Sequence, residues 1–246
     1  MDSKLTDFPI MSFDCYGTLI DWETGIWDAL QPLLMANHRD DIGRTEALAV
    51  FGRHESEQES ENPSLRYTDI LERVHRDIAD AFHLHSDEEM DRAFGYSVPR
   101  WPAFADAAES LRILKRHFRL AILSNVDHDS FAASNQKLGV EFDAIYLAED
   151  IGSYKPDPAN FEYLLEHVEA DFGAHADELL HTAQSLMHDH EQANEFGIAN
   201  CWIDRQRLSE SGDWGATKPI EEWPSTDFQF FSLAELARAV LDEVQE

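Results

Sequence analysis

The sequence predicts an α/β protein with a doubly wound, mostly parallel sheet and one inserted all-helical segment. Two observations support this fold class. From residue 103 to the end, short apolar runs alternate with stretches of helical spacing, the pattern of strands joined by crossover helices. One further apolar run, residues 9–14, is separated from this alternation by residues 22–98, which show helical spacing and little strand signal.

The run at residues 9–14 predicts a buried central strand that ends at Asp14 and is followed by a turn at Gly17 and Thr18. A carboxylate in this position is costly to bury unless it is paired or used. In open parallel sheets, ligands bind beyond the carboxyl ends of the strands. Asp14 is therefore the first candidate for a catalytic group, and the simpler interpretation is that it only caps the turn.

The next segment predicts four helices. In the third of them, apolar residues between 70 and 82 recur on one helical face. Ser86-x-x-Glu89 is typical of a capping box at the start of the fourth. Residues 54–63 are polar and acidic and include Pro63, so we expect a frayed helix end or a loop there. The expected helices are residues 22–36, 44–57, 67–82 and 87–94.

The rest of the chain predicts alternating helices and strands with recognisable helix ends. Asp157 precedes Pro158 at one helix start, and Gly139 and Gly197 follow the ends of two others. Residues 204–230 have no clear periodicity, so we expect a loop. The expected strands are residues 118–124, 142–147, 179–184 and 200–203, and the expected helices are residues 103–117, 129–138, 158–169, 189–196 and 232–244.

These elements predict two parts in the chain. Residues 1–20 and 99–246 form the α/β core, and residues 21–98 form a helical cap inserted directly after the first strand. A cap over the carboxyl edge of the sheet would close a site at Asp14.

The charge balance is strongly acidic. Asp and Glu total 49 against 19 Lys and Arg, a formal net charge of −30 spread along the whole chain of 246 residues. Such self-repulsion destabilises a compact protein at low salt and is screened at high salt. We therefore hypothesise a halophilic protein from a salt-rich cytoplasm, which full stability at very low ionic strength would contradict. No basic patch appears, which disfavours nucleic acid as a partner.

The cysteines and the hydropathy pattern predict a cytoplasmic protein. Cys15 and Cys201 lie far apart in sequence, which fits a reducing compartment better than a disulfide framework. There is no basic leader and no apolar run long enough for a membrane span, so we expect no membrane association. A homodimer is compatible with the sequence, which does not determine the subunit number.

Polar residues follow four of the expected strands. They are Asp14 to Thr18, Ser124 with Asn125, the segment around Lys155, and residues 184–189. Carboxyl ends of parallel strands share one edge of a sheet, so these groups can converge.

Together these groups suit nucleophilic catalysis. A lysine beside a carboxylate keeps that carboxylate ionised near neutral pH. An ionised, partly desolvated carboxylate such as Asp14 can act as a nucleophile and form an ester. A second acid, Asp189, can orient or deprotonate a water molecule.

The order of these motifs resembles the haloacid dehalogenase (HAD) superfamily. The motifs are Asp-x-Tyr-Gly-Thr, Ser-Asn, Lys-Pro-Asp and Ser-x-x-x-Asp. The resemblance implies a Rossmann-like HAD core with a cap. It also implies that Asp14 is the nucleophile, Thr18 and Ser124 are supporting donors, Lys155 is the charge partner and Asp189 belongs to the fourth motif.

The residue two positions after the nucleophile separates the branches of that superfamily. HAD phosphatases carry an acid there that protonates the leaving alcohol, and this chain has Tyr16. Loss of a general acid costs about 10²–10⁴-fold in rate, whereas a halide leaves without a proton. The sequence therefore resembles the L-2-haloacid dehalogenase branch, in which Asn125 would help to hold the halide. Alternatively, Tyr16 only packs beneath the cap.

Some positions depart from the dehalogenase pattern. The dehalogenases have a cap arginine that receives the halide, and Arg53 lies in roughly that place. Phe161 and Leu186 replace a tyrosine and an asparagine of the family pattern, and His188 stands directly before the second acid. His188 is compatible with two roles: assisting the activation of water, or covering the site.

The resulting prediction is an (S)-2-haloacid dehalogenase that removes halide hydrolytically from a small-molecule substrate, a short 2-haloacid. Asp14 forms an aspartyl ester with inversion at carbon, and no metal or other cofactor is required. The remaining site residues have supporting roles: Lys155, Ser124 and Thr18 in charge and donor support, Tyr16, Asn125 and Arg53 in substrate and halide binding, and Asp189, Ser185 and His188 in placing water.

Two alternatives stay open. One is a Mg²⁺-dependent HAD phosphatase in which Asp14 and Asp189 bind the metal. The other is a non-catalytic HAD-fold binding protein whose altered fourth motif marks lost chemistry.

Overall fold

The computed structural model describes residues 3–212, 214–215 and 220–245. Its centre is a six-stranded sheet in the order β3-β2-β1-β4-β5-β6, and every neighbouring pair is parallel. This confirms the predicted doubly wound parallel sheet. The strands are β1 Ile10–Phe13, β2 Arg119–Ser124, β3 Ala144–Leu147, β4 Leu179–Ala183, β5 Ala199–Ile203 and β6 Phe228–Phe230.

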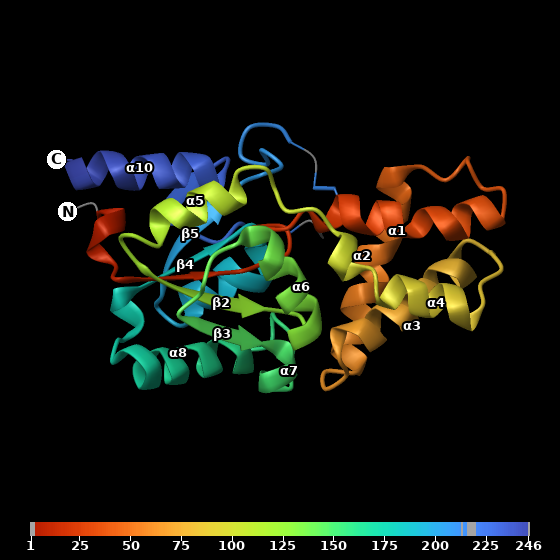
Figure 1. Cartoon of the computed structure of the whole chain (residues 1–246), viewed down its shortest axis with the longest axis horizontal. Helices are drawn as coiled ribbons and strands as arrows, with labels where there is room; N and C mark the ends of the chain where they lie inside the picture. The colour runs from red at the N-terminus through yellow and green to blue at the C-terminus, as the bar shows by residue number, and fades with distance from the viewer. Residues whose placement is uncertain (1–2, 213, 216–219, 246) are drawn as a thin grey trace.

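Helices cover both faces of the sheet. All four residues of β1 are buried, as expected for a strand covered on both faces. Met11 and Phe13 pack into the larger apolar cluster with residues of three helices, whereas Ile10 packs in a second cluster with Phe161. The first face is covered by α5 Ala107–Leu114, α6 His128–Leu138 and α10 Leu233–Gln245, and the second by α8 Ala159–Phe172 and α9 Glu191–Glu195 (Figure 1).

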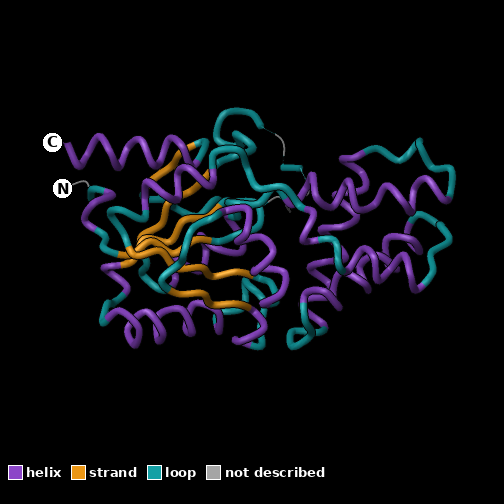
Figure 2. The backbone as a smooth tube through the Cα atoms, in the orientation of Figure 1, coloured by secondary structure: helices purple, strands orange, loops and turns teal. Residues whose placement is uncertain are grey.

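The inserted segment lies beyond the carboxyl ends of the strands, as the arrows of β2 and β3 show (Figure 1). It contains α1 Trp22–Ala36, α2 Arg44–Glu61, α3 Tyr67–Ala81 and α4 Glu88–Gly95, and Figure 2 shows helices and loops in it. The two connections between cap and core run side by side: the Asp21 N–H donates to the Pro102 carbonyl at 2.9 Å. The division at residues 21 and 98 stays a prediction.

Three expectations about local structure were wrong. The acidic stretch after residue 54 is not a frayed end, because α2 continues through it to Glu61. The cap of α4 is Asp87, whose carboxylate accepts from the Met90 N–H at 2.9 Å, while Ser86 bonds to Asp91 instead. The expected loop at 204–230 contains β6, which at three residues is too short for a periodicity to be visible. Residues 213 and 216–219 of that loop lie outside the described residues.

Short elements complete the core. They are α7 Ala148–Ile151, the 3-10 turns Leu5–Asp7, Val98–Arg100 and Ala176–Glu178, and a π-type turn at Leu186–His190.

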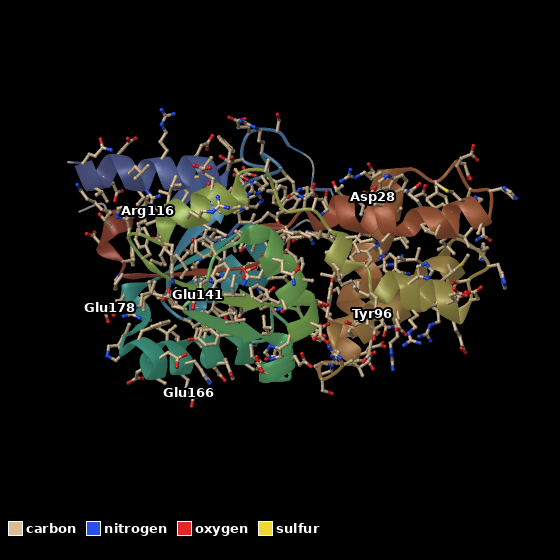
Figure 3. All side chains as sticks on the ribbon, in the orientation of Figure 1. Asp28, Tyr96, Arg116, Glu141, Glu166 and Glu178 are labelled. Atoms are coloured by element: carbon tan, nitrogen blue, oxygen red, sulfur yellow. The ribbon has the colours of Figure 1, made fainter. Side chains whose placement is uncertain are left out.

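Exposed acidic residues lie on both parts of the molecule. Asp28 of the cap and Glu141 and Glu166 of the core are examples of these exposed acids, and their positions are labelled in Figure 3. Neither part therefore holds the charge excess alone. None of the described helices combines the length and the apolar character that a membrane span requires.

Candidate active site

A cavity of about 640 Å³ lies between the carboxyl edge of the sheet and the cap. Its wall combines residues that follow β1, β2 and β4 with residues of α2 and α3. All of the sequence-predicted site residues except Thr18 line it, and Thr18 contacts Asp14 from below. The lining predicted residues are Asp14, Tyr16, Arg53, Ser124, Asn125, Lys155, Ser185, His188 and Asp189.

Asp14 is held at the end of β1 by the turn that follows it. The Thr18 hydroxyl donates to Asp14 Oδ2 at 2.8 Å and accepts from the Gln184 N–H at 2.9 Å. Gly17 has φ +95°, and a Cβ there would lie 2.9 Å from the Gln184 side-chain oxygen. The turn thus needs glycine for its backbone and threonine for its hydrogen bonds, which explains the Gly-Thr pair.

Lys155 connects the two carboxylates of the site. Its ammonium donates to Asp14 Oδ1 at 2.9 Å, to Asp189 Oδ1 at 2.7 Å and to the Leu123 carbonyl at 3.0 Å, which uses all three of its N–H groups. Burial lowers the pKa of Lys155, but the two carboxylates outweigh it and raise that pKa above the ordinary value. Lys155 is therefore a permanent cation between two acids.

The two acids differ in their surroundings. Burial raises the pKa of Asp14, and Lys155 and Thr18 oppose this shift. For Asp189, the attraction of Lys155 and the hydrogen bond from His181 outweigh burial and hold the pKa below its usual range. Asp189 Oδ2 is buried and has no hydrogen-bond partner among the described residues, so one oxygen of this carboxylate is available to a ligand or water.

His181 is a site residue that sequence reasoning missed. It lies on β4, where its Nε2 is 2.9 Å from Asp189 Oδ1 and its Nδ1 is 2.8 Å from the Ser12 hydroxyl of β1. Because a carboxylate only accepts, Nε2 carries the proton in this bond. A polar pair on two adjacent buried strands was the available signal, but it becomes meaningful only once the register of β1 and β4 is known.

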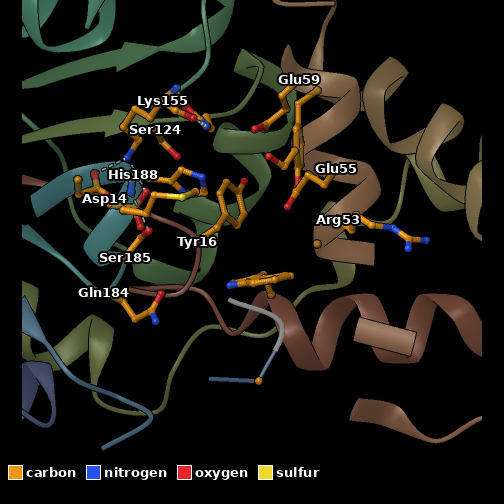
Figure 4. A pocket seen from close by; sticks show the side chains of 18 of the residues that line it. Asp14, Tyr16, Arg53, Glu55, Glu59, Ser124, Lys155, Gln184, Ser185 and His188 are labelled. Atoms are coloured by element: carbon orange, nitrogen blue, oxygen red, sulfur yellow. Dashed lines mark hydrogen bonds and ion pairs between the residues drawn. The ribbon is translucent and has the colours of Figure 1, made fainter. Parts of the chain in front are cut away.

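Ser124 is the last residue of β2 and Asn125 follows it, and the two take different roles. The Ser124 hydroxyl is buried, faces the cavity and has no partner within the described part of the chain (Figure 4). Asn125 makes two bonds with the backbone of Lys155: its amide nitrogen donates to the carbonyl at 2.9 Å, and its oxygen accepts from the N–H at 2.7 Å. Asn125 therefore fixes the position of Lys155.

Ser185 directly precedes the π-type turn after β4, and His188 lies within that turn. The Ser185 hydroxyl accepts from the His188 N–H at 3.1 Å, so it caps this turn. The His188 ring extends into the cavity between Ser124 and Tyr16 (Figure 4).

Tyr16 both lines the cavity and packs beneath the cap. Its hydroxyl lies 3.0 Å from the Ser134 hydroxyl, and its ring meets Trp101 edge-on at 5.5 Å and stacks on Tyr67 at 6.3 Å. Burial raises the pKa of Tyr16 well above the ordinary value, so it stays a neutral phenol.

The cap wall differs from the sequence-based expectation. Arg53 lines the cavity, but its Nη2 lies 3.0 Å from His54 Nε2 and its guanidinium extends away from Asp14 (Figure 4). The side chains that face Asp14 from α2 are those of Glu55 and Glu59 (Figure 4). Both were missed from the sequence because the predicted helix ended at residue 57, and Glu55 and Glu59 share a helical face only when the helix continues to Glu61.

The site fits a divalent metal poorly. Lys155 already bonds to Asp14 Oδ1 and Asp189 Oδ1, and Thr18 bonds to Asp14 Oδ2. Of the four carboxylate oxygens, only Asp189 Oδ2 has no partner among the described residues, and one such oxygen is too few for a divalent ion. Across the described ranges, His, Cys, Asp and Glu form no group of three or more suited to a metal ion.

Known proteins are similar to this chain in sequence and in fold. An (S)-2-haloacid dehalogenase 4A of Burkholderia cepacia is 26% identical over 233 residues, which cover 91% of each chain. An (S)-2-haloacid dehalogenase of Pseudomonas fluorescens is 26% identical over 206 residues, which cover 79% of this chain and 83% of that one. The structure of L-2-haloacid dehalogenase from Xanthobacter autotrophicus with chloropropionic acid covalently bound superposes with a TM-score of 0.76 at 20% identity, covering 95% of this chain and 98% of that one.

The family assignment rests on a separate match. A family model for haloacid dehalogenase-like hydrolases matches residues 10–177, well over half of the chain. The order of the motifs, the parallel sheet and the carboxylate–lysine centre agree with that match, and the chain therefore belongs to the haloacid dehalogenase-like hydrolase family.

Proposed function

We propose that the protein hydrolyses the carbon–halogen bond of 2-haloacids through an ester on Asp14. The observation that carries this proposal is the environment of Asp14: a carboxylate held by Thr18 and Lys155 in a cavity, with Tyr16 where a proton donor for an alcohol would be needed. Relatives that share about a quarter of the sequence are named (S)-2-haloacid dehalogenases, which supports the choice.

In the first step, a carboxylate oxygen of Asp14 attacks the carbon that bears the halogen from the side opposite to it. The new C–O bond forms as the C–halogen bond breaks, the halide leaves with the bonding electrons, and the carbon is inverted. Asn125 keeps one N–H that its bond to Lys155 does not use, and this N–H suits the departing halide. Arg53 contributes only if its side chain turns from His54 toward Asp14.

The substrate carboxylate needs a polar partner on the core wall. Ser124 has an unpartnered hydroxyl there, and the Lys155 ammonium lies close to Asp14. A hydroxyl that donates to a carboxylate forms a strong, charge-assisted bond. We therefore assign the carboxylate to Ser124, with Lys155 providing the positive field.

In the second step, water attacks the carbonyl carbon of the ester. The Asp14 oxygen that stays bonded to Lys155 becomes the carbonyl oxygen, so the same ammonium stabilises the negative charge that develops on it. The free Oδ2 of Asp189 orients the water, and His188 takes its proton and releases it to solvent. Collapse of the intermediate breaks the bond between the Asp14 carbonyl carbon and the ester oxygen. The second proton of the attacking water passes to the departing oxygen, which frees the 2-hydroxy acid and restores the Asp14 carboxylate.

The test is the release of halide from (S)-2-chloropropionate, measured with and without a chelator, for the wild type and Asp14→Asn. We expect release that survives EDTA and is lost in the variant. Phosphate release from p-nitrophenyl phosphate that depends on Mg²⁺, with no halide release, would establish the phosphatase instead. No turnover of either compound would favour the non-catalytic binding protein.

A homodimer, a cytoplasmic location, adaptation to a salt-rich cytoplasm and independence from cofactors all remain predictions. Sedimentation and a salt titration of unfolding address the first and third of these.

A further inference from the structure

The cap wall of the cavity carries two carboxyl groups one helical turn apart, those of Glu55 and Glu59 on α2. Both extend toward the space above Asp14 (Figure 4). Glu55 accepts a hydrogen bond of 2.5 Å from the Tyr67 hydroxyl. Glu59 is only 7% exposed, yet none of the described residues makes a hydrogen bond or ion pair with its carboxyl group.

A buried carboxyl group without a partner is unfavourable in its charged form. Burial raises the pKa of Glu55 to about 7, and it raises that of Glu59 well above the ordinary value, with the charge of Glu55 adding to the effect. The nearby cation, Lys155, already uses its three N–H groups on the core wall. Among the described residues, Glu55 therefore has only the Tyr67 hydroxyl as a hydrogen-bond partner, and Glu59 has none.

The size of the cavity is a second, independent observation. A short 2-haloacid such as 2-chloropropionate has few atoms, whereas pockets of about 300–1,000 Å³ hold drug-sized ligands. At about 640 Å³, this cavity has room for a longer molecule. Its core wall offers the unpartnered Ser124 hydroxyl to one polar end, which leaves the other end to face α2.

We propose that the substrate is a 2-haloacid with an extended chain that ends in an ammonium group, and that Glu55 and Glu59 receive this ammonium. The proposal rests on the proposed function, since it places the substrate carboxylate at Ser124 and the reacting carbon at Asp14. An ammonium supplies the donors and the positive charge that the pair lacks. The net charge of −30 also attracts cations to the protein.

The experiment compares three substrates that differ only at the distal end: 2-chloro-6-aminohexanoate, 2-chloro-6-hydroxyhexanoate and 2-chlorohexanoate. Chloride release is measured with spontaneous release subtracted. A hydrogen bond between two charged groups is about twice as strong as one between neutral groups, so we expect kcat/KM for the amine to exceed the other two by about tenfold or more. Equal rates for the amine and the alkyl compound overturn the proposal, and equal rates for the amine and the hydroxyl compound overturn the assignment of an ammonium.

Variants on the same helix test the residues. Glu59→Gln should abolish the preference for the amine, so that kcat/KM for the amine falls to the value for 2-chlorohexanoate measured on the same variant. Glu61→Gln removes the same charge from the end of α2 outside the cavity, so its preference should equal that of the wild type. A preference that survives in Glu59→Gln and in Glu55→Gln would contradict the proposal.

A binding measurement separates this inference from the proposed function. Calorimetry compares 6-aminohexanoate with hexanoate on the wild-type protein, which requires neither turnover nor a folded variant. Binding of the amine at least about tenfold tighter supports the ammonium site even if no compound releases chloride, in which case only the dehalogenase proposal fails. Equal binding overturns the ammonium site even if 2-chloropropionate is hydrolysed.

Discussion

The two walls of the cavity differ in how completely their charged side chains are paired. On the core wall, Asp14, Lys155, Asp189 and His181 form one connected network with bonds of 2.7–2.9 Å. On the cap wall, Glu55 has a single bond to Tyr67, and Glu59 has none among the residues that the structure describes. Charges that are paired in the free protein need no rearrangement during a reaction. We therefore infer that the core wall is organised for chemistry and the cap wall for a ligand.

The largest effect is expected from Asp14→Asn. An amide is a poor nucleophile, so kcat for halide release should fall by at least about 10³-fold. The same steady-state assay that detects turnover measures the loss, and circular dichroism checks the fold. Because deamidation of the variant would restore activity, freshly purified protein is compared with aged protein. Activity within tenfold of the wild type would show that Asp14 is not the nucleophile.

Lys155→Met should leave the two buried carboxylates of the core wall without a compensating positive charge. Without the ammonium, Asp14 and Asp189 become two uncompensated acids in the interior, and removal of one partner of a buried ion pair costs about 3–5 kcal/mol. Urea unfolding should show a loss of this size, and activity should disappear with it. The matched control is Lys115→Met, which removes a more exposed lysine from a pair with Asp143 and should cost about 1 kcal/mol or less.

His181→Phe tests the support behind Asp189. Loss of the Nε2–H bond leaves Asp189 Oδ1 with Lys155 alone, so the carboxylate should orient water less well. We expect a fall in kcat of about tenfold, the scale of about 1.4 kcal/mol for one hydrogen bond. Intact-protein mass spectrometry should then detect the ester on Asp14, because the second step is the slowed one.

The paired variant is His181→Gln, whose side-chain N–H can reach the same carboxylate and should recover part of the rate. Equal rates for His181→Phe and the wild type would show that Asp189 needs no support from β4.

The smallest effect is expected on the cap wall, from Glu55→Gln. Because the folded pKa of Glu55, about 7, exceeds its ordinary value, the folded protein holds this proton more tightly than the unfolded chain. This contribution to stability is complete at acidic pH and decreases as pH rises toward 7. Glutamine cannot ionise, so the variant should gain about 1–2 kcal/mol relative to the wild type between pH 5 and pH 8.

Chemical unfolding at the two pH values measures this gain, with Glu61→Gln at the exposed end of α2 as the control that should show none. A gain of the same size in both variants would mean that overall charge, and not the cavity, causes the effect.

Much of the fold was predictable because its signals are local. The apolar run of β1, the glycine that follows α6 and the helical periodicity of α3 depend on neighbours in sequence. Nine of the ten candidate site residues came from polar groups at strand ends, and the parallel order of the strands brings eight of these to one cavity and Thr18 directly beneath Asp14. The tenth, Arg53, came from the resemblance to the family, and it reaches the cavity from α2. The local pattern did not predict β6, because this short strand is defined by its pairing with β5 and not by its own sequence.

The sequence alone thus indicated a carboxylate, a lysine and a second acid at the carboxyl edge of a parallel sheet, since strand direction and motif order are encoded along the chain. Only the tertiary structure decided how these charges are shared, that His181 supports Asp189, and that Glu55 and Glu59, and not the guanidinium of Arg53, face Asp14. The reason is physical: which groups meet across a cavity depends on the register of two strands and on the rotation of one cap helix, and neither is visible in the periodicity of either segment.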